Sequence, residues 1–151
     1  MASRGFEFAY MLDGSNATPL IKDWPMAADT AGYKKGDALV MDSLGRADKA
    51  ANNATEIFAI CQESDTTSVS ADENLKVAIA TRGQVWRCSM DASSTSLVKG
   101  YDKAVDIVDE NTVDADGSGS GGLILFDTDT DDDGNVLAYV AFNSTTFHGT
   151  S

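Results

Sequence analysis

The sequence predicts an all-β fold, either a small β-barrel or a sandwich, with an extended N-terminal arm. Short apolar runs alternate with turn-forming residues about every ten residues, which is typical of such folds. No stretch keeps the helical period of about 3.6 residues over three turns. Charge separates the arm from the body, because residues 1–35 carry no net charge and the rest of the chain carries the whole net charge of −13.

Residues 1–30 are predicted to form the arm. Apolar and polar side chains alternate over residues 6–10, as in a strand with one apolar face. The sequence Asp-Gly-Ser-Asn at 13–16 favours a turn, and two prolines disfavour a helix over residues 19–25. We expect this segment to fold against another surface, either its own domain or a partner.

Residues 31–151 are predicted to form the β-rich body. Hairpins are expected at the turn over 42–46, at Arg82-Gly83, where it would join two neighbouring strands, and at the Asp-rich turn that joins the last two strands. Residues 47–55 predict a loop or a helical turn, and the Gly-rich residues 114–122 predict a flexible loop. The expected strands cover residues 38–41, 56–61, 75–80, 84–90, 104–108, 123–126 and 136–142.

Composition excludes two classes of partner. A pI near 4.1 with scattered Lys and Arg argues against nucleic acid, since phosphate binding needs clustered basic residues. The apolar runs are far shorter than the roughly 20 residues of a membrane helix. The N-terminus lacks the apolar core of a secretory signal, so we expect no membrane partner and a reducing compartment during synthesis.

One motif resembles a metal site. Residues 129–134 match the opening of a calcium loop, D-x-D-x-D-G, but Val140 stands where that loop needs a bidentate Glu, and strands flank the motif. A solvated hairpin turn is the favoured interpretation. Weak calcium binding by Asp129, Asp131 and Asp133 is the alternative, and we predict neither a metal centre nor a cofactor.

The sequence predicts no catalytic residue. The only histidine, His148, lies four residues from the C-terminus, which does not favour a positioned Ser-His-Asp arrangement. The Gly-rich residues 117–122 lack the Lys-Ser/Thr of a phosphate-binding loop. Cys61 and Cys88 are expected as core residues, and a disulfide between them needs neighbouring strands. A carboxylate-based hydrolase stays an alternative, which predicts an acid with a raised pKa in a pocket.

Four aromatic residues of the arm are the candidate binding residues: Phe6, Phe8, Tyr10 and Trp24. They either pack on their own domain as a first strand or anchor on a partner or a neighbouring copy. Aromatic anchors on extended backbone without net charge suit strand addition or groove binding. We favour the anchoring role, and expect that removal of residues 1–25 leaves a folded domain without its binding activity.

Residues 33–90 resemble the decoration, or cement, proteins of tailed double-stranded DNA bacteriophage capsids. The resemblance implies a small β-barrel or β-tulip protein, usually a trimer, that clamps neighbouring major capsid subunits and has an N-terminal arm lying on the capsid or joining its strands. Residues 114–135 depart from the family pattern. The resembling segments are Gly-Tyr-Lys-Lys-Gly-Asp-Ala-Leu-Val-Met (32–41), Gly-Arg-Ala-Asp-Lys-Ala-Ala (45–51), Glu-Ile-Phe-Ala-Ile-Cys-Gln-Glu-Ser (56–64) and Leu-Lys-Val-Ala-Ile-Ala-Thr-Arg-Gly-Gln-Val-Trp (75–86).

The expected function is that of a non-enzymatic virion structural protein. Its partners would be the major capsid protein and two further copies in a homotrimer, and it would be made in the host cytoplasm and reside on the outer capsid surface. The alternative is a β-sandwich module that binds host-surface carbohydrate. That alternative requires exposed aromatic side chains, for which Trp24 is the candidate.

Overall fold

The computed structural model describes residues 5–51, 56–90, 104–114, 123–130 and 132–142. Within these ranges it contains eleven β-strands and no helix, which confirms the predicted all-β fold. The strands are β1 (Glu7–Met11), β2 (Ile21–Pro25), β3 (Ala38–Met41), β4 (Ala47–Lys49), β5 (Ile57–Cys61), β6 (Asn74–Ile79), β7 (Gln84–Met90), β8 (Ala104–Asp109), β9 (Thr112–Asp114), β10 (Leu123–Thr130) and β11 (Val136–Phe142).

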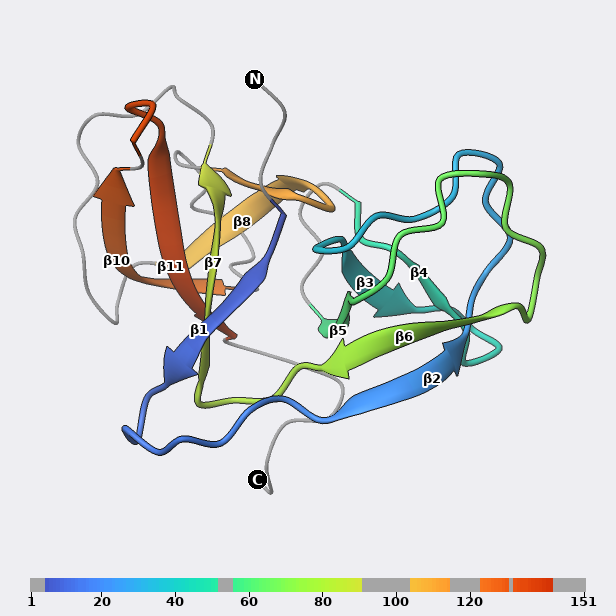
Figure 1. Ribbon diagram of the computed structural model, residues 1–151, viewed down its shortest axis with the longest axis horizontal. Helices are drawn as coiled ribbons and strands as arrows, with labels where there is room; N and C mark the ends of the chain where they lie inside the picture. Colours follow the sequence, from blue (N-terminus) through green and yellow to red (C-terminus); the bar gives the residue numbers. More distant parts are fainter. Residues whose placement is uncertain (1–4, 52–55, 91–103, 115–122, 131, 143–151) are drawn as a thin grey trace.

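The strands form two sheets, which occupy the left and right halves of Figure 1. The larger sheet has the order β1-β7-β11-β10-β8-β9, and the smaller sheet has the order β2-β6-β5-β3-β4. Strand pairs are antiparallel, except that the end of β7 also pairs in parallel with β9. The two sheets do not close into one barrel, so the arrangement is sandwich-like.

Two of the predicted hairpins are confirmed. In the β3–β4 turn, the Asp42 Oδ1 accepts the backbone N–H groups of Leu44 and Arg46, each at 2.9 Å. Gly45 in this turn has a φ of +81°, which glycine adopts without steric cost. β10 and β11 pair antiparallel along their lengths, so the last predicted hairpin is also present.

The predicted hairpin about Arg82-Gly83 is wrong. β6 belongs to the smaller sheet and β7 to the larger one, so this turn carries the chain between the sheets. The buried amide of Gln84 bonds the backbone of this crossing: its Nε2 donates to the Ile79 carbonyl at 3.0 Å. Its Oε1 accepts the N–H of Thr81 at 3.2 Å and the indole N–H of Trp86 at 2.9 Å.

Residues 47–55 also differ from the prediction, which was a loop or a helical turn. Residues 47–49 form β4, because their backbone pairs with β3 across the tight turn. Residues 52–55 lie outside the described residues, as do residues 115–122 of the predicted flexible loop.

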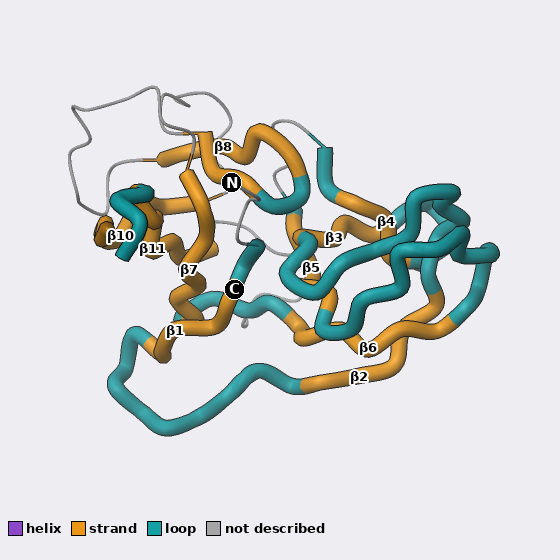
Figure 2. The backbone as a smooth tube through the Cα atoms, turned by 45° about the horizontal axis from the view of Figure 1, so that its top comes forward, coloured by secondary structure: helices purple, strands orange, loops and turns teal. Residues whose placement is uncertain are grey.

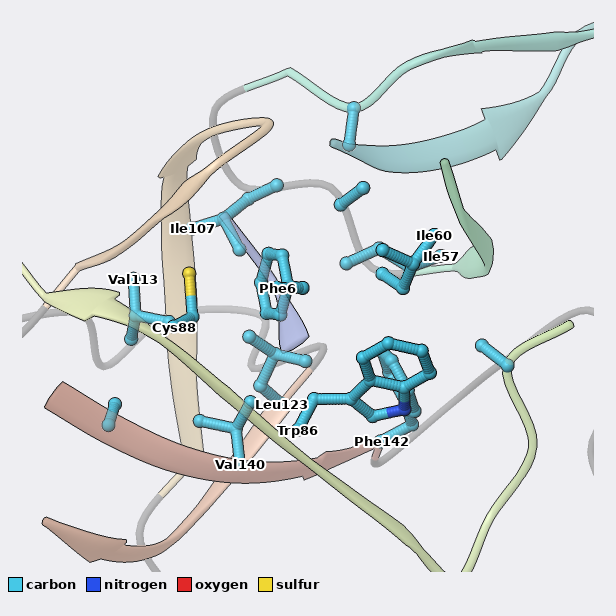
Figure 3. Packing of buried hydrophobic residues seen from close by; sticks show 14 of the residues in the cluster. Phe6, Ile57, Ile60, Trp86, Cys88, Ile107, Val113, Leu123, Val140 and Phe142 are labelled. Atoms are coloured by element: carbon cyan, nitrogen blue, oxygen red, sulfur yellow. The ribbon is translucent and has the colours of Figure 1, made fainter. Parts of the chain in front are cut away.

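The main core lies between the two sheets. Trp86 of β7 is 1% exposed, and Phe6, just before β1, is 2% exposed. Figure 3 shows Phe6 in the middle of this cluster, with Ile57 and Ile60 of the smaller sheet on one side. The N-terminal segment therefore contributes a central side chain to the core that joins the sheets.

A second apolar cluster covers the opposite face of the smaller sheet. Phe58 and Ala59 both belong to it, because the β3–β5 register shifts here and places two successive β5 residues opposite one. Tyr33 is fully buried in this cluster, and its hydroxyl donates to the Ala27 carbonyl at 2.7 Å. β5 is thus buried on both faces.

Residues 7–25 of the predicted arm are extended but paired with the body. β1 pairs with β7, and β2 pairs with β6. Between the two pairings, the Leu12 N–H donates to the Gly83 carbonyl at 2.7 Å, and the Ile79 N–H donates to the Leu20 carbonyl at 2.8 Å. Figure 2 shows this segment passing from one sheet to the other. We call residues 7–25, which comprise β1, β2 and the connection between them, the outer strand.

Deletion of residues 1–25 is expected to unfold the chain, contrary to the expectation from the sequence. The deletion removes β1, β2 and the core residue Phe6. Truncating one buried Phe to Ala typically costs about 3–5 kcal/mol, a large part of the roughly 5–15 kcal/mol that stabilises a domain. Circular dichroism during urea unfolding measures this, with Phe6→Ala as the milder variant. A cooperative transition in the truncated chain would contradict the expectation.

The turn at residues 34–37 ties the two sheets together. The Phe6 N–H donates to the Gly36 carbonyl at 2.8 Å, and the Gly36 N–H donates to the Cys61 carbonyl at 2.8 Å. The first N–H of β3 donates to the Glu110 carbonyl, between β8 and β9, at 2.7 Å. One turn therefore holds the N-terminal segment, the end of β5 and the β8–β9 connection.

Asp37 closes this turn from inside the protein. It is 3% exposed, and its Oδ2 accepts the Lys34 N–H at 2.9 Å. Burial, assisted by the negative charge of Glu110, raises the pKa of Asp37 to about 6, against the opposing effects of the Lys34 N–H and the cations Lys49 and Lys34. The neutral carboxyl is favoured in the fold, so its stabilising effect is complete below pH 4 or so and is lost as the pH rises through about 6.

Asp37→Asn should therefore be more stable than the wild type at pH 8 and equally stable near pH 4. The amide keeps an acceptor for the Lys34 N–H and carries no charge to bury. From the raised pKa we expect a difference of about 3 kcal/mol at pH 8, measured by urea unfolding across the pH range. Asp132→Asn, in an exposed turn, is the control. A variant with the wild-type pH dependence would contradict this role of Asp37.

Candidate functional site

The candidate site is the outer strand, because its two β-strands lie at sheet edges. β1 begins the strand order of the larger sheet, and β2 begins that of the smaller one. In the part of the chain that the structure describes, each therefore pairs on one side only. A free edge presents backbone N–H and C=O groups to which another extended segment can add.

Two of the four predicted anchors face the core. Phe6 is 2% exposed and belongs to the core cluster. Phe8 is half-buried, packs against the same cluster, and lies edge-on to the Trp86 ring with 5.6 Å between centroids. For these two residues the structure matches the first alternative, in which the aromatic residues pack on their own domain.

Tyr10 faces away from that core, contrary to the single apolar face that the sequence predicts. The β1–β7 register shifts between Phe8 and Tyr10. Phe8 lies opposite Trp86, whereas Tyr10 lies opposite Val85, whose side chain points to the other face of the sheet. A β-bulge thus interrupts the alternation and turns the Tyr10 side chain outward.

On the outer face Tyr10 joins a small aromatic cluster. Its ring stacks on that of Tyr139 and meets that of Phe126 edge-on, each with 6.2 Å between centroids. Partial burial, followed by the negative charge of Asp127, raises the pKa of the Tyr10 hydroxyl. At 40% exposure, Tyr10 is the predicted anchor most available to a partner.

Trp24 braces the smaller sheet. Its ring centroid lies 5.2 Å from that of Phe58, and its indole N–H donates to the Gly45 carbonyl in the β3–β4 turn at 2.9 Å. The side chain is half-buried. Trp24 therefore packs on its own domain, with only part of its ring left for a ligand.

Sequence reasoning missed three exposed apolar residues of the outer strand. Leu12 is 42% exposed, Leu20 64% and Ile21 48%. Together with Tyr10 they make up what we call the apolar stripe, two pairs of exposed apolar residues, one at the end of β1 and one at the start of β2. The sequence did contain a signal for two of these exposed residues. Leu20 and Ile21 form an apolar pair beside Pro19, in a segment whose pattern fits neither an amphipathic helix nor a strand with one buried face.

A small hollow adjoins the apolar stripe. Its volume is about 230 Å³, and Leu12, Ile124 and Phe126 are among the residues that line it. Phe126 also contacts Tyr10. The stripe therefore continues into a concave apolar surface on the larger sheet.

The acidic motif forms a turn. Asp129 lies at the end of β10, and Asp132-Asp133-Gly134 makes the turn to β11, while Asp131 lies outside the described residues. Gly134 has a φ of +85°. Within the described ranges no three His, Cys, Asp or Glu side chains are placed to hold a metal ion.

Neither the cysteines nor the buried acid suggests catalysis. Cys61 and Cys88 are free and buried, on strands of different sheets. Burial raises the pKa of Cys61 to about 11 and the pKa of Cys88 well above its ordinary value, so both stay protonated thiols at neutral pH. Asp37 has the raised pKa that the hydrolase alternative requires, but it is 3% exposed and closes a structural turn. His148 lies outside the described residues.

Comparison of the chain with protein-family models, curated proteins and solved structures found no match. Within the described ranges, no helix has the length and apolar character needed to cross a membrane. The candidate site therefore stands on its geometry and on the character of its exposed residues.

Trp24→Phe is expected to destabilise the fold by about 1 kcal/mol. Phenylalanine keeps most of the contact with Phe58 but loses the bond to the Gly45 carbonyl, and one hydrogen bond typically contributes about 0.5–1.5 kcal/mol. Urea unfolding at pH 7 measures the difference. Tyr10→Phe, which removes a hydroxyl from an exposed ring, is the control and should change stability by less than about 0.5 kcal/mol. Equal stability of the Trp24 variant and the wild type would contradict the bracing role.

Proposed function

We propose that the chain is a virion structural protein that binds the outer surface of a phage capsid as a trimer and clamps neighbouring major capsid proteins. The observation that carries the proposal is the apolar stripe, whose four side chains are 40–64% exposed on a chain with a net charge of −13. The two pairs of exposed apolar side chains at the ends of one connection are what we interpret as an interaction surface. The resemblance of residues 33–90 to capsid decoration proteins supports the same function.

The outer strand offers a partner both backbone and side-chain contacts. β1 and β2 provide edge N–H and C=O groups, and the apolar stripe at the end of β1 and the start of β2 provides side chains to bury. Attachment then needs no free arm, because the binding residues are held on the body. This position differs from the sequence-based hypothesis, in which Phe6 and Phe8 also reach the capsid.

Stabilisation of the shell follows from mass action. A protein that binds the assembled shell better than its separate subunits shifts the equilibrium toward the shell. A stable contact buries roughly 1,200–2,000 Å² of surface. In a trimer, one bound copy raises the effective concentration of the other two, so a modest contact for each copy gives firm attachment.

The double variant Leu20→Gln, Ile21→Gln should bind capsids at least about tenfold more weakly than the wild type. Both side chains are exposed, so the fold keeps its core while the partner loses two apolar contacts. Co-sedimentation with emptied tailed-phage capsids measures binding, and light scattering measures the trimer. Leu44→Gln is the matched control, because Leu44 is 73% exposed in the β3–β4 turn and is not part of the stripe.

Two results would contradict the proposal. One is a wild-type protein that is monomeric and does not co-sediment with capsids. The other is a double variant that binds as well as the Leu44→Gln control, which would remove the apolar stripe as the attachment surface.

A second candidate function, recognition of host-surface carbohydrate, is favoured by the partly exposed aromatic cluster of Tyr10, Tyr139 and Phe126. Aromatic rings with one apolar face and a polar edge suit ligands of mixed polarity. Trp24, the residue expected for this role, has its indole N–H bonded to Gly45. Glycan-array binding that is lost in Tyr10→Ala would support this candidate over the first.

A further inference from the structure

A hollow of about 720 Å³ opens at the junction of the two sheets. One wall is the segment 5–8, which leads into the outer strand. The others are Lys35 and Gly36 of the 34–37 turn, Gln62 after β5, and Arg87 of β7. Its walls thus come from both sheets, and it is separate from the hollow beside Leu12.

The backbone of this hollow is firmly held. Gly5 and Gly36 are in such close contact that a Cβ on Gly5 would lie 2.8 Å from the Gly36 carbonyl oxygen, which only a glycine permits. The Phe6 N–H donates to the same oxygen at 2.8 Å. A ligand therefore meets preformed walls, and little ordering is needed when it binds.

Not all N–H donors of the Arg87 guanidinium are used in hydrogen bonds. One terminal nitrogen lies 3.5 Å from the Glu7 carboxylate, and the Tyr139 hydroxyl is a second partner. The buried Nε–H has no hydrogen-bond partner in the described structure. A guanidinium carries five N–H donors in a planar fork, so this arrangement uses only some of them.

Lys35 adds a second positive charge to the hollow. Its backbone N–H donates to the Ser64 hydroxyl at 2.9 Å, which fixes the residue while its side chain stays exposed. No carboxylate of the described residues forms an ion pair with it. By contrast, Arg46, Lys49 and Lys76 each pair with an aspartate.

We propose that this hollow binds a carboxylate group, which the Arg87 guanidinium and the Lys35 ammonium contact together. Gln62 is a polar residue of the wall, and its Nε2 donates to the Ile60 carbonyl. On a chain with a net charge of −13, two cations beside one acid make this the place where an anion is attracted.

The neighbouring Glu7 selects the kind of anion. Its carboxylate lies at the hollow and repels a second negative group. A singly charged carboxylate meets less repulsion than a doubly charged phosphate, and its two oxygens match the guanidinium fork. The ligand is therefore a carboxylate, from a small molecule or from an acidic side chain of a protein.

The test is titration of the full chain with two carboxylate probes, followed by amide NMR shifts. The probes are butyrate, which carries one carboxylate, and a blocked peptide with one glutamate, and butyramide is the uncharged control. We expect saturable shifts at Gly5, Gly36 and Gln62. Binding of butyrate alone assigns the site to a small molecule, and binding of the peptide assigns it to a protein side chain.

Two variants and one control test the roles of the cations. Lys35→Gln and Arg87→Lys should each weaken binding of the carboxylate at least about fivefold. The first removes a positive charge, and the second replaces the planar guanidinium, with its paired N–H donors, by an ammonium. Lys22→Gln removes the same charge from an exposed position on β2 and should leave binding unchanged. Since Lys35 is exposed, its variant keeps the fold and tests the site even if the Arg87 variant unfolds.

The proposal is overturned by any of three results: no saturable shift with either carboxylate, equal binding of butyramide, or undiminished binding in Lys35→Gln. The capsid proposal does not depend on this hollow. A Lys35→Gln variant that loses carboxylate binding and still co-sediments with capsids separates the two.

Discussion

The join between the two sheets depends on the buried amide of Gln84. Its three hydrogen bonds hold the crossing from β6 to β7 and satisfy the indole nitrogen of Trp86, the largest buried side chain of the core. A buried polar group without a hydrogen-bond partner costs about 1–3 kcal/mol. An apolar residue at position 84 would leave the Thr81 N–H, the Ile79 carbonyl and the Trp86 indole N–H without this partner. This side chain thus connects the crossing to Trp86, whose ring contacts Phe8 and which shares a core cluster with Phe6.

The outer strand combines a structural and an interaction role in one segment. Its inward side chains complete the core, and its outward ones make the apolar stripe. The bulge between Phe8 and Tyr10 separates the two sets, because it changes which face the next side chain meets. Edge strands that expose apolar residues tend to aggregate, and the high net negative charge of the chain opposes that tendency.

Local features could be predicted from the sequence, whereas pairings between distant segments could not. Alternation and turn chemistry predicted most strands and the hairpins at Asp42–Arg46 and β10–β11. The turn at Arg82-Gly83 contains the same kind of turn residues as those two hairpins, yet it carries the chain from one sheet to the other. The buried amide of Gln84, which bonds the backbone of this crossing, is not a local turn signal. The sequence predicts anchors among the aromatic residues of the arm, but their division between core and surface depends on a bulge without a local signal.

The pairing of β1 with β7 places Glu7 opposite Arg87, a residue about eighty positions later in the chain. During synthesis, the first strand must therefore wait until about eighty more residues have left the ribosome before its partner exists. Contacts so distant in sequence also form slowly once the chain is complete. In that interval the N-terminal segment, which has no net charge, exposes both its core-facing and its outward apolar residues. Most of the negative charge appears only later: residues 36–90 hold eight acidic and five basic side chains, whereas residues 91–151 hold twelve and two, so the charge that keeps chains apart emerges mainly after β7.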